Sequence, residues 1–116
     1  MRRDPRAHLW DVREAARLIT EFAGDVDFDA FEGSLLVRSA VERQFEIIGE
    51  ALSQLAKLDL AMASQVPQFR RIVAFRNVLI HGYAALDHAL VWRVIQEDLP
   101  VLRTAVERLL AATDAG

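Results

Sequence analysis

The sequence has 116 residues, a length that suits one domain, and it contains no cysteine, which excludes disulfides, zinc–thiolate sites and thiol catalysis. The net charge of −3 argues against a general nucleic-acid coat. Hydrophobic residues make up 53% of the chain, which is high for a small monomer and predicts apolar surface buried against a second copy or a partner. Because no apolar run is long enough to span a bilayer and no signal peptide is recognised, we predict a soluble, cytoplasmic protein.

The first helix is predicted to begin at Asp4-Pro5, with the aspartate as N-cap and the proline in the first turn. Gly24 is expected to end it, and His8 is expected to be solvated in its first turn. One apolar stripe follows the helical period, formed by Leu9, Val12, Ala16, Ile19 and Ala23.

The stretch from 24 to 33 alternates aspartate with phenylalanine and is predicted to be a loop. It lacks the glycine and the terminal glutamate of a calcium loop, so no metal site is predicted there. The phenylalanines are expected to fix this loop to the bundle, and Asp29 is expected to cap the helix that follows.

A long second helix is predicted from Ala30 or Ser34 to Lys57, with an apolar stripe that runs from Leu36 to Leu55. A stripe as broad as this one is typical of a helix that packs on more than one neighbour. Gly49 costs roughly 1 kcal/mol of helix stability against alanine, which indicates close approach by another helix. The role of the adjacent Glu50 stays open between an exposed carboxylate and a partner for Arg76 or a backbone donor.

Residues 58–66 are predicted to form an irregular or single-turn link, and Pro67 to start the third helix. Asp87 is expected to cap a fourth helix, in which His88 is solvated and Trp92 is a packing residue. Because an internal proline removes a helix hydrogen bond, Asp98-Leu99-Pro100 predicts either a fifth segment or a kinked continuation. No strand pattern occurs, so residues 1–116 are predicted to form a single all-α domain, an antiparallel bundle of four to five helices.

The candidate site lies at the end of the third helix, where Arg76, Asn77, His81 and Tyr83 fall within eight residues. A guanidinium can hold a phosphate with two hydrogen bonds, and an imidazole exchanges a proton near neutral pH. Positions four apart share a helix face, so the Asn77 amide is expected to orient the His81 ring. Gly82 is expected to stop the helix because glycine accepts the left-handed conformation. An ordinary helix end, with Arg76 paired to Glu50, explains the same spacing.

Charge along the chain supports a site in this region. No acidic residue occurs between Leu60 and Leu86, whereas Arg70, Arg71 and Arg76 all do. This cationic segment coincides with the proposed site, and Arg70 and Arg71 are candidate phosphate-contacting residues close to the motif in sequence. No cysteine pair, His-x-x-Glu-His motif or dense acidic cluster offers a metal site, so no metal or cofactor is predicted.

The longer pattern Arg-Asn-x3-His-Gly-Tyr at 76–83 resembles the Arg-x4-His-x-Tyr signature of the HepT-like toxins, within the HEPN superfamily of helical ribonucleases. Ile47-Ile48-Gly49-Glu50-Ala51 is similar to the Ile-Gly-Glu-Ala segment in the second long helix of that family. The run from Asp87 to Pro100 is similar to its last helices. The resemblance spans roughly 11–110.

The resemblance implies a HEPN-like fold and a metal-independent endoribonuclease, with Arg76 and His81 as the catalytic pair. Asn77 and Glu50 are supporting candidates from their positions in the sequence. With RNA as the implied substrate, Arg70 and Arg71 become candidate RNA-binding residues. The resemblance also implies a homodimer whose two copies share one site, and a toxin–antitoxin pairing. The antitoxin would be a MntA-like nucleotidyltransferase that silences the toxin by transferring AMP onto Tyr83. The alternative is a non-catalytic helical dimer that binds only a nucleotide or a partner.

Overall fold

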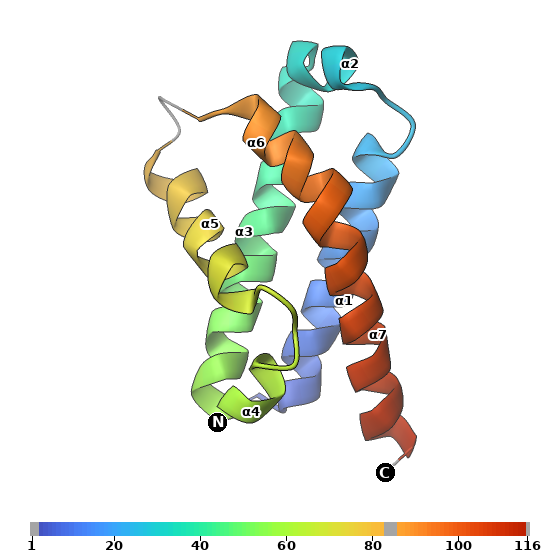
Figure 1. Ribbon diagram of the computed structural model, residues 1–116, viewed down its shortest axis with the longest axis vertical. Helices are drawn as coiled ribbons and strands as arrows, with labels where there is room; N and C mark the ends of the chain where they lie inside the picture. Colours follow the sequence, from blue (N-terminus) through green and yellow to red (C-terminus); the bar gives the residue numbers. More distant parts are fainter. Residues whose placement is uncertain (1–2, 83–85, 116) are drawn as a thin grey trace.

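The structure, a computed structural model, describes residues 3–82 and 86–115. Helices form its regular structure, no strand occurs among these residues, and consecutive long helices run in opposite directions (Figure 1). This arrangement confirms the predicted all-α bundle. None of the described helices is long and apolar enough to cross a membrane. The elements are α1 (Pro5–Ala23), α2 (Phe28–Gly33), α3 (Leu35–Leu58), α4 (Leu60–Ala63), α5 (Phe69–His81), α6 (His88–Arg93), the π-helical turn η2 (Val94–Asp98) and α7 (Leu99–Ala115).

Helix α1 has the predicted ends and the predicted buried face. The Asp4 carboxylate accepts a hydrogen bond from the Arg6 amide at 2.8 Å, and Pro5 occupies the first turn. Gly24 closes the helix, and its amide donates to the Thr20 carbonyl at 2.8 Å. All five residues of the predicted stripe are buried, so burial of one apolar face accounts for this helix.

The predicted loop at 24–33 is wrong in its second half, where α2 forms. The Asp27 carboxylate accepts from the Ala30 amide at 2.9 Å and caps this helix. Phe28 and Phe31 both lie against the Trp92 ring, which confirms the packing roles predicted for these aromatic residues. Asp29 caps nothing downstream, because the Ser34 hydroxyl accepts from the Val37 amide and begins α3.

Helix α3 packs on two neighbours, α1 on one side and α5 on the other, as its broad stripe predicted. Gly49 is buried at the contact with α5. A Cβ atom at this position would collide with Cβ of Arg76 and lie 3.1 Å from its Cγ and Cδ. The predicted close approach at Gly49 is therefore confirmed. Leu36, expected in the apolar stripe, is 81% exposed.

Helix α5 begins and ends by backbone geometry that differs from the prediction. It starts at Phe69, after Gln68 in a left-handed conformation (φ 62°), and not at Pro67. Gly82 ends it with φ −110°, so the predicted left-handed stop is wrong. The Gly82 amide still donates to the Val78 carbonyl at 2.7 Å, and a Cβ at Gly82 would lie 2.8 Å from that oxygen.

The last helices form one continuous run, α6–η2–α7, which lies across the front of the bundle in Figure 1. Asp87 caps it as predicted, accepting from the Ala89 amide at 2.9 Å. The π-helical turn precedes Pro100, and in it the Leu99 amide donates to the Val94 carbonyl. A π turn lets a helix accommodate a local irregularity in its backbone hydrogen bonds. Here the turn lies next to Pro100, which has no N–H to donate. The chain therefore continues through the proline without a separate segment.

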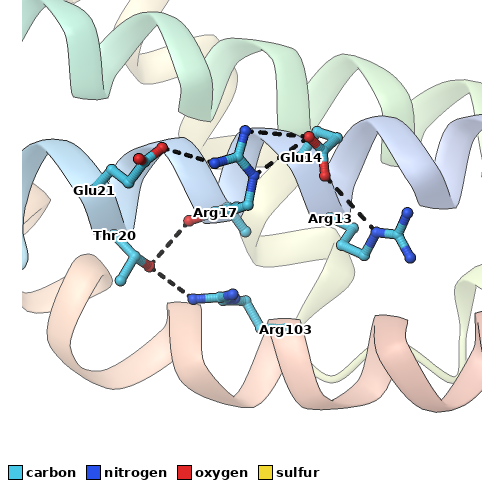
Figure 2. A network of polar contacts seen from close by, with 7 residues as sticks. Arg13, Glu14, Arg17, Thr20, Glu21 and Arg103 are labelled. Atoms are coloured by element: carbon cyan, nitrogen blue, oxygen red, sulfur yellow. Dashed lines mark hydrogen bonds and ion pairs between the residues drawn. The ribbon is translucent and has the colours of Figure 1, made fainter.

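Surface polar contacts align α1 with α7 (Figure 2). Arg103 donates to the Thr20 hydroxyl at 3.0 Å, and Arg17 pairs with Glu21 at 2.8 Å and with Glu14 at 3.3 Å. Exposed pairs of this kind contribute at most about 1 kcal/mol each. None of these residues lines the groove described below.

Candidate functional site

Arg76 lies five residues before His81, the last residue of α5, and its aliphatic stem crosses the backbone of Gly49. Its guanidinium Nη2 is 2.9 Å from Oε2 of Glu50, and Nη1 donates to the Asn77 side-chain oxygen at 3.1 Å. Glu50 was predicted to be either an exposed carboxylate or a partner of Arg76, and it is both: its side chain is 50% exposed and paired with Arg76. An ion pair as exposed as this one stabilises the fold by at most about 1 kcal/mol, so an incoming phosphate can displace the carboxylate.

Asn77 does not have the orienting role that its spacing predicted. Its amide oxygen accepts from Arg76, the preceding residue, and its side chain is exposed. The amide therefore positions the guanidinium, and the imidazole of His81 stands apart from it. His81 is the last residue of α5, and its side chain is exposed.

An open groove of about 720 Å³ lies between the start of α1, the exposed side of α3 and the end of α5. Arg76 and Ile80 line it, but His81 does not. Positions 76 and 81 are about 140° apart around a helix, which explains the separation. Within one copy of the chain, the arginine and the histidine thus serve different faces. The groove is lined by Arg3, His8, Asp11, Arg43, Glu46, Ile47, Glu50, Ala51, Gln54, Lys57, Leu58, Arg76 and Ile80.

His81 belongs to a second surface, the outer face of α5, which consists of Ala74, Asn77, Val78 and His81. All four are exposed and follow the helical spacing of three and four residues. Val78 is 45% exposed although it is apolar. In Figure 1 this helix (yellow) forms one outer edge of the bundle, next to α3.

The candidate RNA-binding residues lie at the opposite end of α5. Arg70 and Arg71 are about ten residues from His81, roughly 15 Å along the helix axis. Arg71 pairs with Asp98 at 3.0 Å, and the Arg70 guanidinium lies over the Phe69 ring, 4.8 Å from its centre. Both side chains are exposed, and neither of them lines the groove that contains Arg76.

Two histidines expected in solvent are partly or fully buried. His8 is only 6% exposed and lines the groove. Burial lowers its pKa, the Arg3 charge lowers it further, and Asp11 and Glu50 act in the opposite direction. Position 8 is four residues before Val12, so the helical period itself placed this ring at the edge of the buried stripe.

His88 is half-buried between α6 and α3, where its Nε2 lies 3.1 Å from Nη1 of Arg38. Burial is the main cause that raises the pKa of the neighbouring Glu42 carboxyl, and Arg38 and His88 act to lower this pKa. Arg38 Nε is buried and has no hydrogen-bond partner among the described residues. Nothing in the local sequence pattern indicated this contact, because its members are 50 positions apart.

Metal ligands are not grouped in the part of the chain that the structure describes: no three histidine, cysteine or acidic side chains there could hold an ion together. Tyr83, the predicted AMP acceptor, lies outside the described residues.

In this helical bundle the two ionisable residues of the motif lie on one helix. Arg76 lines the groove, and His81 lies on another face of α5. Residues 12–109 match the model of the family described as ribonuclease HepT-like. The chain belongs to this HepT-like family of the HEPN ribonucleases.

The chain is similar over nearly its whole length to archaeal and bacterial proteins with ribonuclease names. It is 37% identical to a protein of Methanocaldococcus jannaschii named as a candidate RNase, with 91% of this chain and 96% of that protein covered. It is 33% identical to a probable ribonuclease HepT of Thermococcus cleftensis, with 94% and 98% covered. A candidate RNase of Caldanaerobacter subterraneus is 29% identical, with 91% and 94% covered. No solved structure gives a significant match.

Proposed function

We propose that this chain is a metal-independent endoribonuclease that acts as the toxin of a toxin–antitoxin pair, with one active site shared by two copies. The observation that carries the proposal is the position of the motif. Arg76 lines the groove while His81 is exposed on the outer face of α5, so the two side chains of one copy lie on different faces of the helix. A two-fold dimer through the outer face of α5 would bring two copies of the motif around one cleft.

The chemistry needs only groups that the motif supplies. One His81 takes the proton of the RNA 2′-OH, whose oxygen then attacks the adjacent phosphorus. His81 of the second copy donates a proton to the leaving 5′-oxygen, so the products are a 2′,3′-cyclic phosphate and a free 5′-OH. Arg76 balances the charge that develops on the phosphate oxygens.

Exposed apolar surface supports association of two copies. Val78 lies within the outer face of α5, adjacent to Asn77 and one turn from His81. The chain also has the high apolar content that predicted a covered surface. Interfaces of homodimers are more apolar than ordinary surface, so an exposed valine on this face is in keeping with a dimer through it.

A non-catalytic dimer that binds a nucleotide or a partner is the second candidate, and one observation favours it. The guanidinium of Arg76 is already engaged by Glu50 and Asn77. If that pair is permanent, Arg76 has a structural role only. Cleavage of RNA by the purified protein separates the two candidates.

We expect RNA cleavage to persist in EDTA, because the proposed steps use two imidazoles and a guanidinium. The test compares initial rates of the purified dimer on a labelled RNA with and without chelator. Cleavage that EDTA abolishes and magnesium restores would contradict the proposed chemistry. The nature of the ends gives a second readout, because the mechanism requires a cyclic phosphate.

The proposed antitoxin is a MntA-like nucleotidyltransferase, and the proposed acceptor of AMP is Tyr83. The tyrosine follows His81 by two residues in the sequence. A nucleotide added there brings negative charge and bulk close to the motif, which would oppose binding of an RNA phosphate.

Tyr83→Phe is expected to cleave RNA at the wild-type rate but to resist silencing, because the phenol oxygen is the group that accepts AMP. The measurement is intact-mass and peptide mass spectrometry after incubation with the partner and ATP, alongside the cleavage rate. An adduct that maps to another residue, or that persists in Tyr83→Phe, would sink the assignment.

A further inference from the structure

The groove that contains Arg76 holds an imidazole that the motif does not include. His8, at the end of the first turn of α1, is 94% removed from solvent and lines the groove. It makes no hydrogen bond to any described residue, yet neither ring nitrogen is among the fully enclosed atoms that lack a partner. Its ring nitrogens are therefore not sealed inside the core, and the side chain lines the groove.

The charge state of His8 limits what it can bind. Burial and Arg3 lower its pKa from the ordinary value of 6.5, which favours the neutral form of the ring. A neutral imidazole has one donor nitrogen and one acceptor nitrogen and no charge with which to attract a phosphate. It suits a neutral polar partner that also offers donors and acceptors, as the edge of a nucleobase does.

Glu50 lines the same groove as His8 and Arg76. Its carboxylate lies 2.9 Å from the Arg76 guanidinium. The second carboxylate oxygen accepts from the Gln54 amide at 3.0 Å. A phosphate that displaces Glu50 from Arg76 therefore leaves the carboxylate with a partner.

The size of the groove suits a ligand of nucleotide dimensions. Its volume of about 720 Å³ lies within the range of roughly 300–1,000 Å³ that small-molecule sites occupy. Arg76, from α5, offers charge for a phosphate, and His8, from α1, offers a donor and an acceptor to the same groove. A nucleotide needs both, charge for its phosphate and hydrogen bonds for its base.

We propose that this groove is a base-reading subsite for RNA, in which Arg76 holds a phosphate and His8 hydrogen-bonds the edge of the adjoining nucleobase. The proposal rests on the proposed ribonuclease function and adds a determinant of sequence preference to it. His8 is a specificity residue here, because it contacts the base and takes no part in the proton transfers.

The test measures binding of four short RNAs that differ in one central base, using His81→Ala protein so that the RNA stays intact. We expect one base to bind about tenfold more tightly than the weakest, in line with the 1–3 kcal/mol that good base contacts supply. His8→Leu, which keeps an apolar side chain in the buried site, should reduce this difference to about twofold or less. His8→Asn, which keeps a donor and an acceptor, should retain part of it.

His88→Ala is the matched control, because it removes a half-buried imidazole that does not line the groove. It should leave the base preference unchanged, and helical circular dichroism confirms that each variant is folded. Equal affinities for the four RNAs, or a preference that survives in folded His8→Leu, would overturn the proposal. A base preference without any cleavage by the wild type would instead contradict the ribonuclease function alone, and cleavage without a preference would contradict the subsite alone.

Discussion

Replacing His81 with alanine is expected to lower RNA cleavage by at least about 100-fold while the protein remains folded. General acid–base catalysis contributes roughly 10²–10⁴-fold, and in this account His81 supplies both the acid and the base. His81 is exposed at the end of α5, so its removal leaves no cavity in the core. Initial cleavage rates and a thermal melt of the same samples measure the two effects.

His88→Ala serves as the control for this variant, because it removes another imidazole outside the motif. We expect it to cleave RNA at nearly the wild-type rate. Arg76→Lys extends the test, because lysine keeps a positive charge and an aliphatic stem over Gly49 but lacks the planar fork of donors. A loss of about 10²-fold or more is expected there. Wild-type rates in His81→Ala would remove the histidine from the mechanism.

Gly49→Ala is expected to destabilise the fold by about 1–3 kcal/mol, the usual cost of forcing an extra methyl group into a packed contact. The added Cβ would meet Cβ of Arg76, which is fixed close to the α5 backbone and cannot swing away. The sign of the effect is informative, because alanine in an unobstructed helix is more stable than glycine by roughly 1 kcal/mol. Urea denaturation gives the change in the free energy of unfolding.

Gly33→Ala is the matched control, since no atom lies within 4 Å of a Cβ built at Gly33. We expect this substitution to be neutral or slightly stabilising. A Gly49→Ala protein that is more stable than the wild type would show that α5 does not approach α3 as closely as described. Because Arg76 rests on Gly49, the destabilised variant should also cleave RNA more slowly.

Features set by neighbours along the chain were predictable from the sequence. The stripe of α1 follows from its apolar period, and the Asp87 cap from the position of an aspartate before an apolar run. Gly49 was predictable for a similar reason, because a glycine within a strong helical pattern needs a contact to compensate its cost. The HepT-like motif added the family, which composition and periodicity alone do not identify.

Features set by distant partners were not predictable. Helix α2 depends on Trp92, far along the chain, whose ring packs against its two phenylalanines. The contact between Arg38 and His88 joins α3 to α6. The spacing of Asn77 and His81 predicted a contact between the amide and the imidazole. The asparagine oxygen instead accepts from the adjacent guanidinium of Arg76, which is a stronger donor because it is charged.

The shared active site is tested most directly by mixing wild-type and His81→Ala chains in equal amounts and allowing the subunits to exchange. If one site needs His81 from both copies, only wild-type homodimers cleave RNA, and these are about one quarter of all dimers after random exchange. The account therefore predicts that activity falls from about half of the unmixed wild-type value before exchange to about one quarter after it. Activity that stays at half throughout, or a wild-type protein that cleaves RNA as a monomer, would contradict it.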